Sequence, residues 1–244
     1  MREIIVCDAP AEVGRKAAAI LLEEVRAHRS EYRYSIALSG GNTPRQLYLA
    51  LTEIPGAGRL LAEKSELFFS DERAVPPNSD QSNFRSAQSG LFEPLGLPSG
   101  IIHRLKGEAS DLQAEALRYS ELIRKKVRLG ENGRPSFDLV FLGMGADGHT
   151  ASLFPDSPNE EGAGELLSAR YAPSVSAWRL TFNLTLINDA RTIVFMVTGP
   201  EKAEAVKKAL SADINGYTLP AARVNAARTI WLLDKAAARY AGRT

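Results

Sequence analysis

Short apolar runs rich in β-branched and aromatic residues alternate with longer amphipathic segments, and this alternation limits the fold more than any other feature of the sequence. The apolar runs predict strands at residues 4–7, 34–38, 66–69, 137–142, 192–197 and 229–233. Helical spacing of apolar residues predicts helices at residues 10–28, 44–51, 112–127 and 201–210. The pattern is typical of an α/β fold, a Rossmann-like three-layer sandwich in which helices flank a mostly parallel central sheet.

One interval departs from this alternation. Residues 179–186 alternate between apolar and polar side chains, which predicts an extra half-exposed, antiparallel strand in a smaller β element. Residues 55–58 and 129–135 are rich in turn-forming residues and short enough to be surface loops. Because no repeat or clear linker interrupts the chain, we expect residues 1–244 to form a single domain.

Charge and cysteine content exclude several classes of function. The chain has 30 Lys and Arg and 29 Asp and Glu, a formal charge of +1, so neither nucleic acid nor an anionic membrane is expected as its main partner. The single cysteine, Cys7, excludes an intramolecular disulfide, and its apolar neighbours predict a buried residue. The first apolar stretch is too short for a signal peptide, and no run of about 18 apolar residues occurs, so we expect a cytoplasmic protein.

Ligands of an open α/β sheet bind beyond the carboxyl ends of its strands, where this chain has three polar segments. The first is Leu38-Ser-Gly-Gly-Asn-Thr-Pro44, a glycine pair between a strand and a helix. Glycines permit close approach to the backbone, and the helix N-terminus favours a phosphate, to which Ser39 and Thr43 can add hydroxyl donors. A tight turn capped by Asn42 or Thr43 explains this segment alone equally well.

The second segment is Asp71-Glu-Arg73, directly after an apolar strand. At a strand end, Asp71 can meet a sugar hydroxyl and Arg73 an anionic oxygen. Adjacent opposite charges also commonly form a solvated rim, which is the competing interpretation.

The third segment, Gly143-Met-Gly-Ala-Asp-Gly-His149, is dense in glycine and also follows a strand. Histidine exchanges protons near neutral pH, and Asp147 is close enough in sequence to orient its ring. Of the other two histidines, His28 suits the C-terminal end of a helix and His103 follows an apolar pair. We therefore interpret His149 as the functional histidine.

Two other kinds of chemistry are poorly supported. The three scattered histidines and one cysteine form no metal-ligand spacing. Ser152 lies near His149 in sequence, but no Gly-x-Ser-x-Gly elbow surrounds it, and capping or packing explains it as well as a nucleophile does.

Taken together, the three segments resemble the 6-phosphogluconolactonase family, a branch of a wider group that also holds glucosamine-6-phosphate deaminases. The resemblance rests on Leu38 to Arg45, Ser70 to Phe84 and Leu142 to Pro155, with weaker likeness at Arg179 to Asn188, Thr198 to Lys202 and Trp231 to Asp234. It implies hydrolysis of 6-phosphoglucono-δ-lactone to 6-phosphogluconate, the second step of the oxidative pentose phosphate pathway, without a metal or organic cofactor.

The resemblance also implies roles for individual residues. His149 matches the family's general base, the Asp71 to Arg73 segment lies against the substrate, and the glycine-pair loop helps to bind phosphate. We expect Arg73 or loop N–H groups to hold the oxyanion, and Asp147 to orient His149 or else to bind a sugar hydroxyl or its own backbone. The candidate substrate-binding residues are Ser39, Gly40, Gly41, Thr43, Asp71, Arg179 and Lys202.

Two alternative functions use the same pocket. A glucosamine-6-phosphate deaminase resembles this chain but has an acid at the position of Phe154 and tends to have an aromatic residue at that of Arg73. A non-catalytic sugar-phosphate sensor needs no base, so the presence of both His149 and Arg73 favours an enzyme. Residues 217–228 match the family only loosely, which leaves any contact from Arg223 open. We expect a monomer or weak homodimer.

Overall fold

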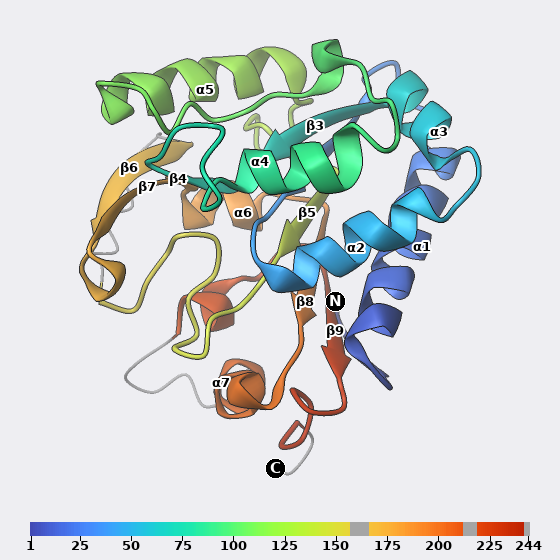
Figure 1. Ribbon diagram of the computed structural model, residues 1–244, viewed down its shortest axis with the longest axis vertical. Helices are drawn as coiled ribbons and strands as arrows, with labels where there is room; N and C mark the ends of the chain where they lie inside the picture. Colours follow the sequence, from blue (N-terminus) through green and yellow to red (C-terminus); the bar gives the residue numbers. More distant parts are fainter. Residues whose placement is uncertain (157–165, 212–218, 242–244) are drawn as a thin grey trace.

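The computed structural model describes residues 1–156, 166–211 and 219–241. At its centre is a six-stranded parallel sheet with the strand order β1-β9-β8-β5-β2-β3 (Figure 1). Its strands are β1 (Arg2–Cys7), β2 (Tyr34–Leu38), β3 (Ser65–Phe69), β5 (Leu139–Leu142), β8 (Thr192–Val197) and β9 (Arg228–Asp234). Each of them coincides with a predicted strand or overlaps it, so the predicted parallel sheet is confirmed.

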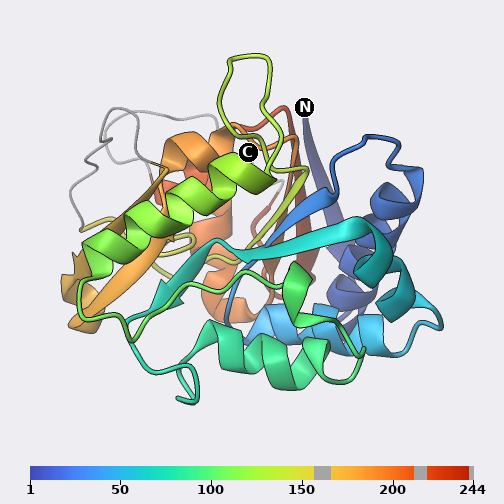
Figure 2. The ribbon, with the colours of Figure 1, turned by 90° about the horizontal axis from the view of Figure 1, so that it is seen from above.

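Helices cover both faces of this sheet. Helices α1, α2 and α3 gather on one side, and α5 lies on the other (Figure 2). The helices are α1 (Pro10–Ala27), α2 (Asn42–Thr52), α3 (Ala57–Lys64), α4 (Asn83–Ala87), α5 (Leu112–Lys126), α6 (Leu184–Asn188) and α7 (Ala203–Leu210). The four predicted helices correspond to α1, α2, α5 and α7, each of which has a buried face.

One predicted loop is partly wrong. Residues 55–58 were expected to form a surface loop, but the turn ends at Gly56, which has a φ of +80°, and α3 begins at Ala57. Ala57 and Leu61 lie one helical turn apart and are both buried, so packing extends a helix into a segment whose composition favours a turn. The loop predicted at residues 129–135 is confirmed, closed by a hydrogen bond from the Gly130 N–H to the Arg134 carbonyl at 2.8 Å.

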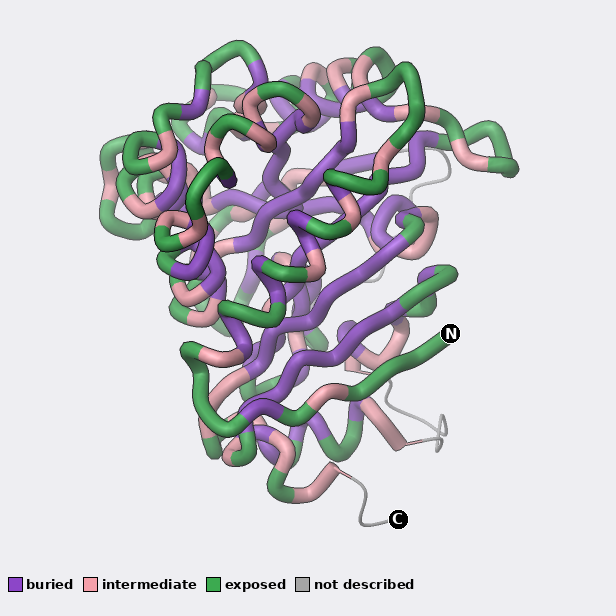
Figure 3. Tube along the Cα trace, turned by 90° about the vertical axis from the view of Figure 1, so that its right-hand side faces the viewer, coloured by how far each residue is buried: buried purple, intermediate pink, exposed green. Residues whose placement is uncertain are grey.

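Burial differs between the inner strands and one edge of the sheet, strand β1, whereas the other edge strand, β3, is buried. The inner strands are buried along their length, whereas β1 is exposed at most positions (Figure 3). The rings of Phe195 and Trp231 stack at 4.0 Å between β8 and β9, and Cys7, at the end of β1, is buried as predicted. The parallel core therefore provides a rigid base for the loops at its carboxyl edge.

A second, three-stranded antiparallel sheet confirms the predicted extra β element. Its order is β4-β7-β6, from β4 (Asp71–Arg73), β7 (Ala177–Phe182) and β6 (Leu167–Ala172). The two sheets meet at Ser70, whose N–H donates to the Leu38 carbonyl and whose carbonyl accepts from the Phe182 N–H, both at 2.8 Å.

The strand expected over residues 179–186 is wrong in its second half. Strand β7 ends at Phe182, and α6 follows, with Asn183 at its N-cap accepting a hydrogen bond from the Ile187 N–H at 3.1 Å. An alternating apolar pattern as short as this one also fits a helical turn, and here Leu186 and Ile187 are buried side by side in the core.

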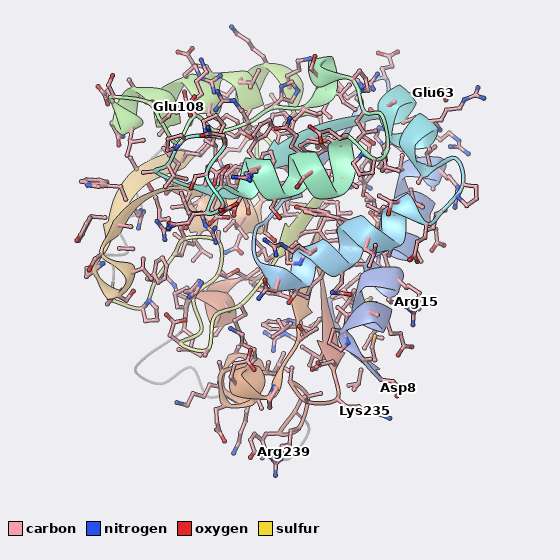
Figure 4. The ribbon with its side chains drawn as sticks, in the orientation of Figure 1. Asp8, Arg15, Glu63, Glu108, Lys235 and Arg239 are labelled. Atoms are coloured by element: carbon pink, nitrogen blue, oxygen red, sulfur yellow. The ribbon has the colours of Figure 1, made fainter. Side chains whose placement is uncertain are left out.

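An ion pair links the ends of the two neighbouring strands β1 and β9. Asp8 follows β1 and Lys235 follows β9, and their side chains form an ion pair at 2.6 Å at the surface (Figure 4). None of the helices in the described part of the chain is long and apolar enough to cross a membrane.

Candidate active site

A cleft of about 410 Å³ opens at the carboxyl ends of the parallel strands. All three polar segments contribute to its wall, together with the segment after β8. The predicted site residues that line it are Ser39, Gly40, Gly41, Thr43, Asp71, Arg73, His149 and Lys202. Asp147 and Arg179 are not among the lining residues, but Asp147 hydrogen-bonds to His149 and Arg179 is paired with Arg73 across strands β4 and β7.

The glycine-pair loop leads into α2. Gly41 has a φ of +105°, a conformation that side chains rarely adopt, and it is the N-cap of α2. No side chain in the described part of the chain caps this helix, and the Thr43 hydroxyl lies 3.0 Å from that of Thr198, so the interpretation of a turn capped by Asn42 or Thr43 is wrong. The first N–H groups of α2 therefore remain free of a side-chain cap beside the cleft, where they favour an anion.

The Ser39 hydroxyl forms part of the same wall. This hydroxyl is buried and has no hydrogen-bond partner among the described residues. The backbone carbonyl of Ser39, in contrast, accepts a hydrogen bond from the Tyr48 hydroxyl at 3.1 Å. Because an unpaired buried hydroxyl is costly, its position is consistent with a ligand that supplies the partner.

The Asp71-Glu-Arg73 segment is not a solvated rim, because Asp71 and Glu72 are both buried. Burial raises the pKa of Glu72, although its carboxylate accepts hydrogen bonds from the Ser82 hydroxyl and from the N–H groups of Asn83 and Phe84 at the start of α4. Glu72 thus anchors the fold. Its two neighbours, Asp71 and Arg73, line the cleft.

Arg73 and Arg179 face each other across the antiparallel pair β4–β7. Burial and the positive charge of Arg73 both lower the pKa of Arg179. The described residues provide neither guanidinium with an ion-pair partner within 4.0 Å, and each donates to a backbone carbonyl, Arg73 to Gln81 and Arg179 to Trp178. Like charges directly opposite in a sheet are destabilising, so this pair is suited to an anionic ligand.

His149 and Asp147 form a hydrogen-bonded pair within their loop. The Asp147 Oδ1 lies 2.7 Å from the His149 Nδ1 and also accepts from the His149 backbone N–H at 3.1 Å. Burial raises the pKa of Asp147, but the hydrogen bonds and the charge of His149 outweigh burial, and the net shift is downward. With Nδ1 engaged, Nε2 is the ring nitrogen left for chemistry in the cleft.

Two glycines make this pair possible. A Cβ on Gly145 would lie 2.1 Å from the His149 Nδ1 and 2.3 Å from the Asp147 Oδ1. Gly148 has a φ of +82°, and its N–H donates to the Gly145 carbonyl at 3.0 Å. The glycine density seen in the sequence therefore has a local cause, since the loop must turn tightly around the histidine–carboxylate pair.

The residues after His149 complete the wall. The ring of Phe154 lies against that of His149, with centroids 4.5 Å apart and planes inclined by 32°. The Ser152 hydroxyl is buried and donates to the Asp71 Oδ2 at 2.7 Å, which leaves it poorly placed to act as a nucleophile.

The segment after β8 contributes more than the sequence analysis assigned to it, since only Lys202 was predicted there. Thr198, Gly199 and Glu201 also line the cleft, and Gly199 has a φ of +102°. The Gly199 N–H donates to both carboxylate oxygens of Asp234, at 3.2 and 3.1 Å. The Thr-Gly-Pro sequence directly after a buried strand is the sequence feature that could have predicted this part of the cleft. Arg223, within the loosely matching residues 217–228, is not among the residues that line the cleft.

In the described part of the chain, no three His, Cys, Asp or Glu side chains are grouped so that they could hold a metal ion. A histidine–carboxylate pair, Arg73, Lys202 and a helix N-terminus at one cleft are typical of an enzyme that acts on an anionic ligand.

Comparison with known proteins gives the family. The family model described as glucosamine-6-phosphate isomerases/6-phosphogluconolactonase matches residues 8–231, and the chain belongs to this family. The 6-phosphogluconolactonase of Haemophilus influenzae is 35% identical over 206 residues, which cover 84% of this chain and 86% of that protein.

Solved structures agree. The 6-phosphogluconolactonase of Trypanosoma brucei superposes with a TM-score of 0.86 at 29% identity, covering 99% of both chains. A monomeric glucosamine-6-phosphate deaminase superposes with a TM-score of 0.81 at 23% identity, covering 98% of this chain and 99% of that one, a likeness that shows the shared fold alone.

Proposed function

We propose that this protein hydrolyses 6-phospho-D-glucono-1,5-lactone to 6-phospho-D-gluconate, a step of the oxidative pentose phosphate pathway. Its family and the names of its relatives support this activity. The observation that carries the proposal is the His149–Asp147 pair in a cleft that Arg73 also lines. A base beside a cation meets the two needs of lactone hydrolysis, an activated water and a stabilised oxyanion.

The proposed reaction uses His149 as the general base. Asp147 accepts a hydrogen bond from the Nδ1–H of His149 and so holds the ring in the tautomer whose Nε2 lone pair is free. Nε2 takes a proton from water as the water oxygen bonds to the lactone C1. When the C1–O5 bond breaks, the ring oxygen leaves as an alkoxide and receives that proton back from Nε2, which restores neutral His149.

The other residues bind and stabilise. Arg73, or N–H groups of the loops, holds the oxyanion that develops on the C1 carbonyl oxygen. Asp71 accepts hydrogen bonds from sugar hydroxyl groups, and Arg179 adds positive charge next to Arg73. The remaining residues proposed to bind the phosphate are Ser39, Gly40, Gly41, Thr43 and Lys202.

Deamination of glucosamine 6-phosphate is the nearest alternative. At the position of Phe154, the deaminases that this chain resembles have a residue with a carboxylic acid. Phe154 packs on the His149 ring and cannot carry a second proton. A non-catalytic sensor of sugar phosphates would have no need of the ordered histidine–carboxylate pair.

The test is a coupled assay with freshly generated lactone near neutral pH, after subtraction of spontaneous hydrolysis, with wild type, His149→Ala and Arg73→Ala. We expect turnover well above background for wild type only. Ammonia release from glucosamine 6-phosphate without lactone turnover would instead identify a deaminase. Binding of 6-phosphogluconate without any turnover would identify a sensor.

We also propose that the protein acts in the cytoplasm as a monomer or weak homodimer. The near-neutral charge and the single, buried cysteine support a reducing, aqueous compartment. Light scattering across a range of concentrations measures the assembly state directly, and a concentration-independent larger oligomer would contradict it.

A further inference from the structure

Asp71 is buried in the cleft wall, yet both of its carboxylate oxygens are held by side chains of the protein. The Ser152 hydroxyl donates to Oδ2 at 2.7 Å, and the Asn83 Nδ2 donates to Oδ1 at 3.1 Å. A carboxylate has about four lone-pair sites, so two acceptor sites remain after these bonds are made. Since Asp71 lines the cleft, these sites are available to a ligand there.

The Asn83 amide can hold Asp71 in only one orientation. Its Nδ2 donates both to the Asp71 backbone carbonyl, at 2.9 Å, and to the Asp71 carboxylate. Both partners are acceptors, so the amide nitrogen must face them. Gly40 makes room for this amide, because a Cβ there would lie 1.7 Å from the Asn83 Oδ1.

Ser152 is fixed as firmly from the other side. Its backbone N–H donates to the Thr181 hydroxyl at 3.2 Å, and Thr181 is the residue that faces Asp71 across strands β4 and β7. Ser152 therefore bridges this cross-strand pair.

The turn that delivers Ser152 is strained and closed on itself. Ala151 has a φ of +47°, unusual for a residue with a side chain, and Thr150 and Leu153 exchange backbone hydrogen bonds at 3.3 and 2.9 Å. Such strain persists only where the surrounding contacts impose it, and it is concentrated at functional sites. The turn begins one residue after His149, so it ties the loop of His149 to Asp71 and Thr181.

We propose that Ser152 and Asn83 are positioning residues that aim the Asp71 carboxylate at the hydroxyl groups of the sugar, and so select polyhydroxylated phosphate esters over other phosphates. This inference rests on the proposed function and adds the residues that set its specificity. The negative charge of Asp71 repels a phosphate, so the residues around it recognise the sugar part of the ligand.

Ser152→Ala tests this role, with Ser120→Ala as the matched control. Ser120 is equally buried, and its hydroxyl donates to the Ala116 carbonyl at 2.8 Å within α5, away from the cleft. We expect Ser152→Ala to raise the KM for the lactone and the Kd for 6-phosphogluconate about 3-fold to 10-fold with little change in kcat. Inhibition by inorganic phosphate, which has no sugar hydroxyls, is expected to stay unchanged, and Ser120→Ala to change none of these values.

A double-mutant cycle with Asp71→Ala separates positioning from packing. If Ser152 acts through the Asp71 carboxylate, Ser152→Ala has no further effect on 6-phosphogluconate binding once that carboxylate is gone. Multiplicative effects of the two substitutions, or an equal loss of inorganic phosphate binding in Ser152→Ala, would overturn the proposal. An unchanged Kd in a folded Ser152→Ala protein would overturn it too.

The binding measurements also keep this inference distinct from the proposed function. A wild-type protein that binds 6-phosphogluconate but hydrolyses no lactone refutes the lactonase, while its Kd values still decide the role of Ser152. If Ser152→Ala fails to fold, Thr181→Val removes the acceptor of the Ser152 N–H, and the same selective loss of 6-phosphogluconate over phosphate is expected. Equal weakening of both ligands in that variant would contradict the proposal.

Discussion

Among the residues that the structure describes, two histidine–carboxylate pairs have the same chemistry and different surroundings. His103 Nε2 bonds to Glu66, and their side chains are 11% and 7% exposed, whereas those of His149 and Asp147 are 32% and 44% exposed. Lys126 and Arg33 also contact Glu66, at 3.2 and 3.5 Å, which neutralises the buried carboxylate. The first pair is part of the fold, and only the second presents a ring nitrogen to a cleft.

The surroundings of the two rings explain the difference. The His103 ring packs on that of Phe68, with centroids 4.6 Å apart. The backbone carbonyl of His103 accepts a hydrogen bond from the Tyr119 hydroxyl at 2.7 Å. The His149 ring also packs on a phenylalanine, but its loop lies at the carboxyl edge of the sheet. A histidine beside a carboxylate is therefore insufficient evidence of catalysis, and access of the second ring nitrogen to a cleft distinguishes the two cases.

Replacing each histidine with alanine should have opposite consequences for turnover and stability. This is the largest effect that we expect. His149→Ala should lose about 10²–10⁴-fold in kcat, the usual contribution of a positioned base, with little loss of stability. His103→Ala should keep its kcat but lose about 1–3 kcal/mol of unfolding free energy, because Glu66 loses a buried partner. Lactone turnover and urea denaturation of both variants measure this. Near-wild-type turnover by folded His149→Ala would remove the base from the mechanism.

A methyl group added at Gly145 should disturb the His149–Asp147 pair without affecting the His103–Glu66 pair. Gly145→Ala places a Cβ against both His149 and Asp147, so we expect kcat to fall by about 100-fold, the scale associated with a displacement near 1 Å. Gly100→Ala is the control, because a Cβ there meets nothing within 4 Å. Equal activity of the two variants would show that the contact between His149 and Asp147 is dispensable.

The pH dependence of stability should report on the buried pair, as the smallest of these effects. Burial lowers the pKa of His103, and the hydrogen bond that the ring donates to Glu66 opposes that shift without cancelling it. The folded state therefore favours the neutral ring, while the unfolded chain binds a proton near pH ~6.5. Stability from this source is complete above that pH and is lost as the pH falls toward the folded-state pKa.

Chemical denaturation between about pH 7 and pH 5 measures this loss, and His103→Gln should reduce its slope. A histidine C–H resonance of His103 that titrates above the ordinary range in NMR would contradict the direction of the shift.

The sequence predicted the parallel sheet well because each inner strand is buried on both faces and so consists of a nearly continuous apolar run. The small sheet was harder to predict. Strand β4 has only the three polar residues Asp71–Arg73, and it is a strand because it pairs with β7, more than 100 residues away in the sequence. Its register depends on a tertiary contact that no local pattern encodes.

The candidate site likewise has parts that the sequence predicts and parts that only the fold reveals. The positions of His149, Arg73 and the glycine loop follow from the rule that ligands bind at the carboxyl ends of the strands. The role of Glu72 as an anchor and the bond from Ser152 to Asp71 depend on residues 10 and 81 positions away, respectively. Spacing along the chain cannot reveal such contacts, since the fold alone brings the partners together.

The strand order has a consequence for how activity arises during folding. Strand β1, the first in sequence, pairs only with β9, the last, and the cleft draws its wall from segments between residues 10 and 202. Pairings between distant parts of a chain form slowly, and partial structures lack them. We expect no half of this protein to have a working cleft, and recovery of turnover after dilution from denaturant to keep pace with completion of the sheet.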